Sequence, residues 1–372
     1  MSAPTHDREG ITVAARPDGL MAYVTRHDTT HITIHDSGLA ATVADLARRG
    51  DFLILDPGLY AAWEKQLRPV LRPGRYLVAE PGEQGKSPAQ ALRIIDRLHE
   101  AGVDRRTTLT AVGGGVVCDL TGLVAALYFR GVRAAYVPTT LLAMIDASIG
   151  GKTGVNHPRQ KNLLGTFSHP AEVHIRLDAL HTLPTGHVTS AFGEAVKIAL
   201  VDDPTLFELL ADPRAGDVAW MRSIVEICVR RKLQLLGANC FERDLERALN
   251  LGHTVAHPLE DITAFRIPHG TAVAIGIAVA CHISHARGLL PTADLERILH
   301  VLHRLGLPVM DPDVDPGLLQ ERVQHLLLQR GGRSLHYVLP VTIGKIAFTD
   351  TITPAELRDA VTDLRRRQEE GA

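Results

Sequence analysis

TTLTAVGGGVVCDLTGLVAALY, residues 107–128, predicts a strand, a glycine turn and a helix in succession. Glycines at such a turn let the backbone approach a pyrophosphate, and the helix N-terminus offers amide donors to the anion. A strict GxGxxG pattern would need glycine at position 118, where the chain has Cys118, and glycine triplets also form turns that bind no ligand. The stretch therefore predicts a strand–helix unit and leaves nucleotide binding open.

Short runs rich in β-branched residues alternate with helical stretches on both sides of this unit. Strands separated by helices of roughly ten or more residues imply βαβ units, hence a mostly parallel sheet with helices on both faces. The expected strands are 31–35, 51–56, 75–79, 107–112, 134–137 and 172–177.

The pattern changes after Pro184, where long amphipathic stretches indicate a helical domain. The expected helices are 187–201, 219–237, 244–261, 270–287, 293–305 and 316–329. We therefore expect a Rossmann-like α/β domain over residues 1–184 and an all-α domain over residues 185–372.

Composition is that of a soluble globular enzyme, with 45% hydrophobic and 22% charged residues and a formal net charge of -2 among 372 residues. No charge excess indicates nucleic acid or a membrane surface as a partner. The longest apolar runs fall short of the roughly 20 residues of a membrane span, and residues 1–10 lack the apolar core of a signal peptide. Four cysteines without a CxxC pattern suit reduced thiols. We expect a cytoplasmic protein.

Polar clusters follow several predicted strands. The loop from Asp146 to Asn162 carries Lys152 and Lys161 among glycines, so it can present cations and amide donors to a phosphate. Glu83, Lys86 and the pair Thr139-Thr140 add further polar groups. A solvated basic loop is the alternative interpretation.

The predicted helical domain carries a metal-like pattern. Residues three and four apart share one helix face, so Glu194 with Lys197, and Asn250 with His253 and His257, each form a stripe. Glu194, His253 and His269 would supply a carboxylate and two imidazoles, which suits zinc or cobalt and leaves positions open for substrate. The other partition, a His253–His257 ligand pair, lacks the glutamate of HExxH metalloproteases. Histidines on apolar helices are also often core residues.

Many ordered motifs resemble the sugar phosphate cyclase family, whose best-known member is 3-dehydroquinate synthase. They run from about residue 80 to residue 345 and include Gly113-Gly-Gly115, Val137-Pro-Thr-Thr140, Asp146-x-x-x-Gly-Gly-Lys152-Thr, Lys161-Asn162, Gly193-Glu-Ala-Val-Lys197, Leu251-Gly-His-Thr254 and His269-Gly270. The resemblance implies an NAD-binding domain, a helical metal domain, an active site in the cleft between them, and a homodimer.

The resemblance also implies roles for single residues. Those expected to bind NAD are Asp56, Glu83, Lys86, Gly114, Gly115, Val116, Asp119, Thr139, Thr140 and Lys161. Those expected to contact a sugar phosphate are Arg130, Asp146, Lys152, Asn162, Lys197, Lys232, Asn250 and His257, with Arg130 acting in its own subunit or across the dimer. The metal ligands are expected to be Glu194, His253 and His269, and the catalytic residues Lys152, Lys197, Glu242, Asn250 and His257.

The family's chemistry is redox-neutral. NAD oxidises a ring hydroxyl, which acidifies the adjacent C–H, and the metal polarises the ketone. Phosphate is eliminated, the hydride returns, and an intramolecular aldol closes a carbocycle. The departing phosphate, His257 or Glu242 is expected to relay protons.

Departures from the family pattern bear on the substrate. Glu246 stands where 3-dehydroquinate synthases have an arginine that helps engage the substrate's carboxylate, with Arg247 shifted by one, and the segment from Leu326 to Arg333 lacks their lysines. Both features indicate a substrate without a carboxylate and favour the cyclases that convert sedoheptulose 7-phosphate to valiolone-type C7 cyclitols. Those enzymes usually replace the second histidine and the asparagine, which persist here as His257 and Asn250.

Other functions stay open. A 3-dehydroquinate synthase ranks second and a 2-deoxy-scyllo-inosose synthase third. An NAD-dependent polyol dehydrogenase of similar architecture is a different class, and it would have no use for the phosphate-directed residues Lys152, Asn162 and Lys197.

Overall fold

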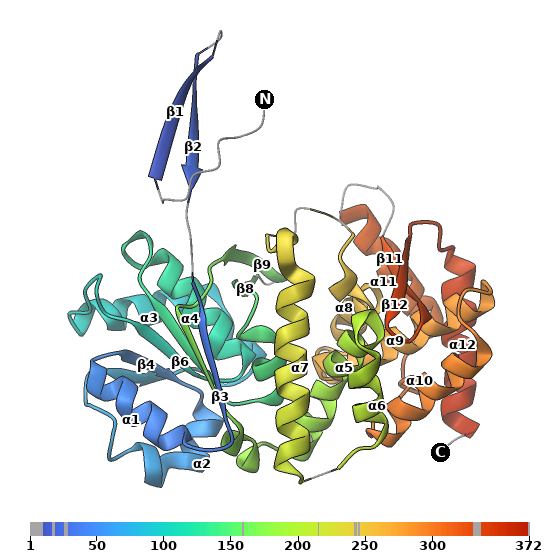
Figure 1. The fold of residues 1–372 in the computed structure, drawn as a ribbon, viewed down its shortest axis with the longest axis horizontal. Helices are drawn as coiled ribbons and strands as arrows, with labels where there is room; N and C mark the ends of the chain where they lie inside the picture. Colours follow the sequence, from blue (N-terminus) through green and yellow to red (C-terminus); the bar gives the residue numbers. More distant parts are fainter. Residues whose placement is uncertain are drawn as a thin grey trace.

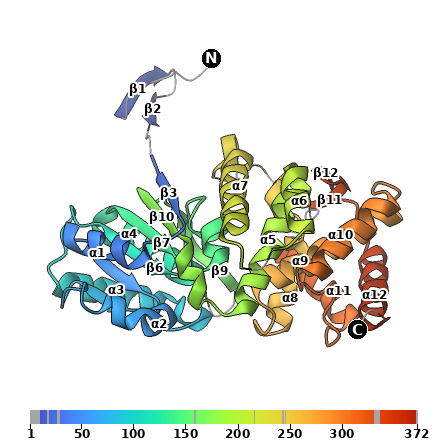
Figure 2. The ribbon, with the colours of Figure 1, turned by 60° about the horizontal axis from the view of Figure 1, so that its bottom comes forward.

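The computed structural model describes residues 10–16, 19–25, 29–157, 160–214, 216–241, 244, 246–329 and 336–370. The α/β half and the helical half lie side by side along the long axis of the molecule (Figure 1). A hairpin of β1 (Gly10–Arg16) and β2 (Gly19–Thr25) stands away from both halves (Figure 2).

The α/β half contains a six-stranded sheet with the order β3-β10-β7-β6-β4-β5, and each neighbouring pair is parallel. Strands β4, β6 and β7 are buried along their whole length, as central strands covered on both faces should be. The predicted α/β fold is confirmed, and each predicted strand overlaps an observed one. The strands are β3 (His31–His35), β4 (Phe52–Leu55), β5 (Tyr76–Val78), β6 (Leu109–Gly113), β7 (Ala134–Pro138) and β10 (Glu172–Arg176).

Helices cover both faces of this sheet. Helices α1 (Leu39–Arg49) and α2 (Pro57–Leu67) pack together on one face, and α3 (Pro88–Glu100) and α4 (Gly115–Leu127) on the other (Figure 1). The connections that contain α1 and α2 run across the sheet toward β5, whereas those that contain α3 and α4 run back toward β7, so the direction changes between the neighbouring strands β4 and β6. Because crossovers are right-handed, this change places the two pairs on opposite faces. Ligands of such sheets bind at the carboxyl ends of the strands beside this reversal.

A second hairpin lies where the two halves meet. It consists of β8 (Lys152–His157) and β9 (Gln160–Phe167) and packs against α4 (Figures 1 and 2). Short helical turns complete this half: η1 (Glu83–Gly85), η2 (Tyr128–Arg130), the π-turn η3 (Ala143–Ala147) and η4 (Leu177–Thr182).

The second half is helical, as predicted, and adds one antiparallel hairpin of β11 (Tyr337–Thr342) and β12 (Lys345–Thr349). Its centre is α9 (His269–Ala286), which is apolar on all sides and packs against α5, α8, α10 and α12. None of the described helices combines the length and apolarity that a membrane span requires. The division near residue 184 stays a prediction. The other helices are α5 (Thr185–Asp202), α6 (Pro204–Ala211), α7 (Val218–Leu236), α8 (His253–Ile262), α10 (Thr292–Arg304), α11 (Pro316–Gln329) and α12 (Pro354–Glu370).

The predicted helix over residues 244–261 is wrong in its first part. Helix α8 begins only at His253, and Asn250 ends a separate turn, η6 (Ala248–Asn250). Gly252 lies between them with φ 81, in the left-handed region where a helix cannot continue. Asn250 and His253 therefore do not share a helix face.

Candidate active site

Helices α5 and α9 touch at their backbones. A methyl group on Gly193 would overlap the carbonyl oxygen of Gly270, and a methyl group on Gly270 would overlap that of Ser190. Glu194 follows the first glycine and His269 precedes the second. The backbone contact therefore brings Glu194 and His269 together.

The turn before α8 meets α9 in the same way. A methyl group on Gly276 would overlap the carbonyl oxygen of Gly252. His253 directly follows Gly252 and is the first residue of α8. Close backbone contacts thus hold all three predicted metal ligands, which lie on three different helices.

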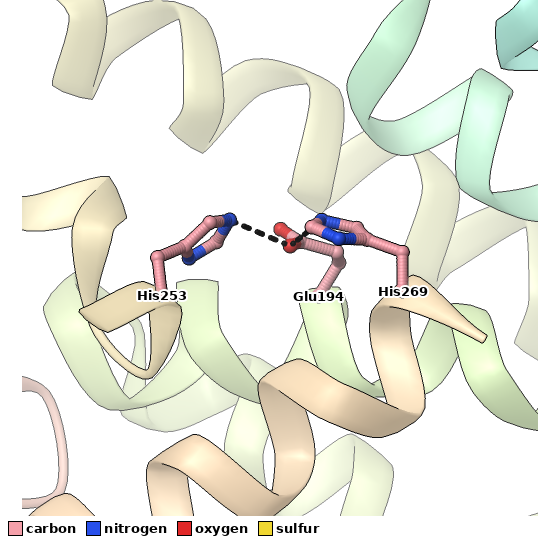
Figure 3. Close-up of side chains that lie close together, drawn as sticks. All are labelled: Glu194, His253 and His269. Atoms are coloured by element: carbon pink, nitrogen blue, oxygen red, sulfur yellow. Dashed lines mark ion pairs between the residues drawn. The ribbon is translucent and has the colours of Figure 1, made fainter. Parts of the chain in front are cut away.

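Glu194, His253 and His269 form one cluster (Figure 3). Their candidate ligand atoms all lie within 4.8 Å of one another. Glu194 Oε1 is 3.5 Å from His253 Nε2 and 3.3 Å from His269 Nε2. Glu194 is fully buried, and its other oxygen, Oε2, forms an ion pair with Lys197. A buried carboxylate facing two imidazole nitrogens fits a divalent cation.

The outer nitrogens of both histidines have partners. His253 Nδ1 is 3.2 Å from the carbonyl oxygen of Leu251, and His269 Nδ1 is 3.2 Å from Glu260 Oε1. Such partners fix the ring orientation and tautomer of metal-binding histidines. Both Nε2 atoms are thereby left to face Glu194.

The charges around the cluster are coupled. Burial lowers the pKa of His253 well below its usual value, which favours the neutral form that binds metals. Burial raises the pKa of Glu194, but Lys197 and the two histidines lower it by more than burial raises it. The net pKa lies well below its usual value, so the carboxylate stays ionised. Burial lowers the pKa of His269, whereas Glu194 and Glu260 raise it, with a net value of about 9.

A cavity of about 490 Å³ opens beside this cluster. Its walls come from both halves of the molecule. They include the predicted residues Asp119, Asp146, Lys152, Asn162, Lys197, Lys232, Asn250, His253, His257 and His269. Of the residues expected to contact a sugar phosphate, all but Arg130 line this cavity.

Two lysine side chains of this cavity are held in place by acidic partners. Lys232 Nζ donates hydrogen bonds to the carbonyl oxygen and Oδ1 of Asp146, at 2.6 and 2.7 Å. Lys197 is buried and forms an ion pair with Glu194. The cations suited to a phosphate and the cluster suited to a metal are therefore in direct contact, through Lys197 and Glu194.

His257 lies one turn beyond His253. Its ring centroid is 5.2 Å from that of His253 and 6.3 Å from that of His269, on which it stacks. It belongs to the cavity wall but not to the three-ligand cluster. This arrangement suits a group that handles substrate beside the metal.

The predicted nucleotide residues gather at the carboxyl ends of β4, β6 and β7. Gly113 packs against Asp56, which caps α2 by accepting the amide of Leu59 at 3.0 Å, and Gly114 packs against Thr140. The N-terminus of α4 has no side-chain cap, so its amides stay available to an anion. Gly115, Val116 and Thr139 lie in the same region.

Lys86 and Glu83 connect this region to the β8–β9 hairpin. Lys86 Nζ lies 2.6 Å from both Asp119 Oδ2 and Asn162 Oδ1. Glu83 accepts the side-chain amide of Asn156 at 2.8 Å. Residues expected to bind NAD and residues expected to bind substrate therefore share one network.

Three predicted residues have a different outcome. Arg130 is exposed at the end of η2 and does not line the cavity of its own chain. Glu242 lies outside the described residues, as do positions 330–333 of the segment from Leu326 to Arg333 that lacks the lysines. Glu246, which was expected to repel a substrate carboxylate, has an exposed side chain and is not among the residues that line the cavity, whereas Arg247 is.

Two family models match consecutive parts of the chain. The N-terminal model of 3-dehydroquinate synthase covers residues 76–190, and the C-terminal model covers residues 191–327. The chain belongs to the 3-dehydroquinate synthase family. It is a sugar phosphate cyclase of that family.

Relatives of both main types are similar to this cyclase. A 2-epi-valiolone synthase of Stigmatella aurantiaca is 42% identical over 81% of this chain and 77% of its own. A 3-dehydroquinate synthase of Synechococcus is 36% identical over 89% and 94%. The structure of a 2-epi-5-epi-valiolone synthase from Streptomyces hygroscopicus, with NAD+ and Zn2+ bound, superposes with a TM-score of 0.85 at 31% identity, over 93% of this chain and 99% of that one.

The structure adds residues to the cyclase site that the sequence did not single out. Thr254 and His336 line the cavity together with Arg247, which the sequence had placed one position after Glu246, and Glu260 contacts His269. Thr254 lies within a quoted motif. Glu260 is seven residues after His253, on the same face of α8. This spacing is the feature of the sequence that could have indicated Glu260.

Proposed function

We propose that this cyclase uses NAD and a divalent metal, zinc or cobalt, to convert sedoheptulose 7-phosphate to a valiolone-type C7 cyclitol. One observation carries the proposal: a single cavity joins a carboxylate–bis-histidine cluster to several cations suited to a phosphate. Metal and phosphate binding in one cavity are what a cyclase that eliminates phosphate requires.

The proposed cofactors fit the residues that are present. Glu194, His253 and His269 would hold the metal, and the uncapped N-terminus of α4 with the glycine turn would hold the pyrophosphate of NAD. When bound, NAD would supply reversible hydride removal, and the metal would supply a Lewis acid that stabilises negative charge on a substrate oxygen.

The side chains of the chain position the substrate. Lys152, Lys197 and Asn162 line the cavity and can bind the phosphate by charge-assisted hydrogen bonds. Lys232 holds Asp146 in place, which keeps both groups at the wall. Fixing the phosphate in this way orients the neighbouring C–H and the leaving oxygen toward each other.

His257 is proposed as the proton carrier. It lines the cavity beside the metal histidines and is not part of the three-residue cluster, so it is placed to face a bound substrate. Glu242 is proposed to assist, as the family resemblance implies. Asn250 lines the same wall and can orient a substrate hydroxyl.

The choice of sugar rests on the relatives and on the retained site. The similar valiolone-type synthases in sequence and structure support a C7 sugar without a carboxylate. Arg247 in the cavity wall favours a second candidate, the carboxylated substrate of 3-dehydroquinate synthase. A polyol dehydrogenase would not need the lysines of the cavity, which are suited to binding a phosphate.

The substrate assignment is tested with three sugar phosphates side by side: sedoheptulose 7-phosphate, the carboxylated seven-carbon substrate of 3-dehydroquinate synthase, and glucose 6-phosphate. Each is incubated with the protein, NAD and zinc or cobalt, and phosphate release is measured. We expect release from the first and little from the others, with the product's epimer identified by comparison with 2-epi- and 2-epi-5-epi-valiolone. Turnover of the carboxylated sugar alone would establish the second candidate.

We further propose that Arg130 completes the site of a second subunit in a homodimer. Support comes from its exposure, its absence from the residues that line the cavity of its own chain, and the neighbouring Leu127 and Phe129, which are 54% and 47% exposed. Mixing an Arg130→Ala variant with the inactive His253→Ala variant should give more activity than either variant alone if Arg130 acts across the dimer. No recovery in mixed dimers of confirmed composition would place Arg130 in its own subunit.

A further inference from the structure

Glu260 is a buried carboxylate that none of the proposed chemistry uses. It is 2% exposed and lies on α8, four residues before the region where the chain turns away at Ala264. With His253 and His257 it forms an i, i+4, i+7 stripe, so all three side chains share one face of the helix. That face looks toward the metal cluster.

One oxygen of Glu260 has two partners. Oε1 is 3.2 Å from His269 Nδ1 and 2.9 Å from Lys161 Nζ. The other oxygen, Oε2, is buried and has no hydrogen-bond partner within the described part of the chain. His269 and Lys161 also lower the pKa of this carboxyl to about 2 against the effect of burial, so it is ionised.

Lys161 brings the α/β half into this contact. It lies on β9, and its ammonium is also 3.8 Å from Glu83 Oε1 and 5.1 Å from the ring centroid of Phe265. Lys161 therefore connects η1 of the α/β half to α8 of the helical half.

A purely structural role does not explain this arrangement well. Burying an ion pair costs desolvation free energy, and apolar residues of similar volume often give equal or greater stability. A carboxylate that accepts the outer N–H of a metal-binding histidine, by contrast, fixes the ring and raises its basicity as a ligand.

We propose that Glu260 is a positioning residue of the metal centre, which holds His269 with Nε2 toward the metal and, through Lys161, ties that centre to the β8–β9 hairpin. The inference rests on the metal site of the proposed function. Glu260 itself touches neither metal nor substrate in this role, because it acts through His269.

The test measures metal affinity in the full-length, metal-free protein, by competition for Zn²⁺ with a chromophoric chelator. Glu260→Gln keeps the shape and removes the charge, and Asp261→Asn makes the same change at the exposed neighbouring position. Loss of an outer-shell partner typically weakens metal binding by about 10- to 100-fold, so we expect at least about a 10-fold rise in Kd for Glu260→Gln. For Asp261→Asn we expect a change within about twofold, as for surface substitutions.

A second readout separates positioning from stability. The visible absorption of the Co²⁺-loaded protein reports the ligand geometry, and it should change in Glu260→Gln but not in Asp261→Asn. Lys161→Met should weaken zinc binding less than Glu260→Gln, because His269 keeps its partner. An unchanged Kd and Co²⁺ spectrum in a folded Glu260→Gln protein would overturn the inference, whereas wild-type protein that binds no metal would overturn the proposed metal site itself.

Discussion

The two sides of the cavity are built by different means. On the metal side, short side chains come from helices whose backbones touch at glycines, and Glu194 is fully buried. On the phosphate side, long cationic side chains reach the cavity from a hairpin and from α7, and Lys152 is exposed. The metal side should therefore tolerate almost no change in backbone spacing, whereas the phosphate side should tolerate changes that preserve charge.

The largest effect is expected from His253→Ala. Removing one of three ligands should reduce the metal content of the purified protein to background and abolish activity, measured by elemental analysis and phosphate release. His257→Ala, one turn away, should also lose activity but keep its metal. Equal metal content in the two variants would contradict the division between ligand and substrate group.

Gly193→Ala tests the backbone contact. The added methyl group would overlap the carbonyl oxygen of Gly270, so we expect a loss of about 1–3 kcal/mol in the free energy of unfolding, together with weaker metal binding. Gly186→Ala, on the same helix, meets no atom within 4 Å and should change stability by less than about 1 kcal/mol, in the stabilising direction. Chemical denaturation of both variants would show whether the glycine contact, or helix propensity alone, decides the outcome.

Lys152 tests the tolerance of the phosphate side. Lys152→Met should lower kcat/KM about 10- to 100-fold, because a charge-assisted hydrogen bond contributes about 1.5–3 kcal/mol. Lys152→Arg keeps the charge and should lose less. Steady-state kinetics with unchanged metal content would support this assignment. A larger loss for Arg than for Met would mean that Lys152 is held as tightly as the metal ligands.

The smallest effect is expected outside the site. Arg287 donates a hydrogen bond that lowers the pKa of Glu356 to about 2 from 4.5, with Thr353 acting in the same direction and burial opposing it. A lowered folded-state pKa stabilises the protein above pH 4.5, and the contribution is lost as the pH falls through about 2. Glu356→Gln should cost less than about 1 kcal/mol at neutral pH, and the difference from wild type should vanish near pH 2.

The metal content of Glu356→Gln should equal that of wild type. This variant therefore controls for stability in the comparison above. Metal loss in Glu356→Gln would mean that any modest destabilisation empties the site, and the metal results for Gly193→Ala would then carry no positional information.

Local patterns predicted most of the fold, because each buried strand depends on nearby residues. Glu194, His253 and His269 lie on three different helices, and they were grouped by their ligand chemistry and by the family resemblance of the motifs that carry them. The start of α8 was missed because the amphipathic pattern runs through Gly252, whose positive φ ends the helix. Glu260 was missed because its partners lie 9 and 99 residues away in the chain.

The substrate interpretation shows the same limit. Sequence register placed Glu246 at a substrate position, but the turn before Asn250 exposes it and brings Arg247 to the cavity. A shift of one residue in an irregular segment reverses which side chain faces inward, and no periodicity reports it. The choice between a neutral and a carboxylated sugar therefore needs measurement.

We propose that one cavity couples metal and phosphate binding in a redox-neutral cyclisation. The most direct test follows phosphate release and NADH absorbance together, in one sample of the metal-loaded protein with NAD and sedoheptulose 7-phosphate. We predict one phosphate released for each sugar consumed, with no accumulation of NADH. NADH accumulating in step with substrate loss, without phosphate release, would identify a dehydrogenase and contradict the account.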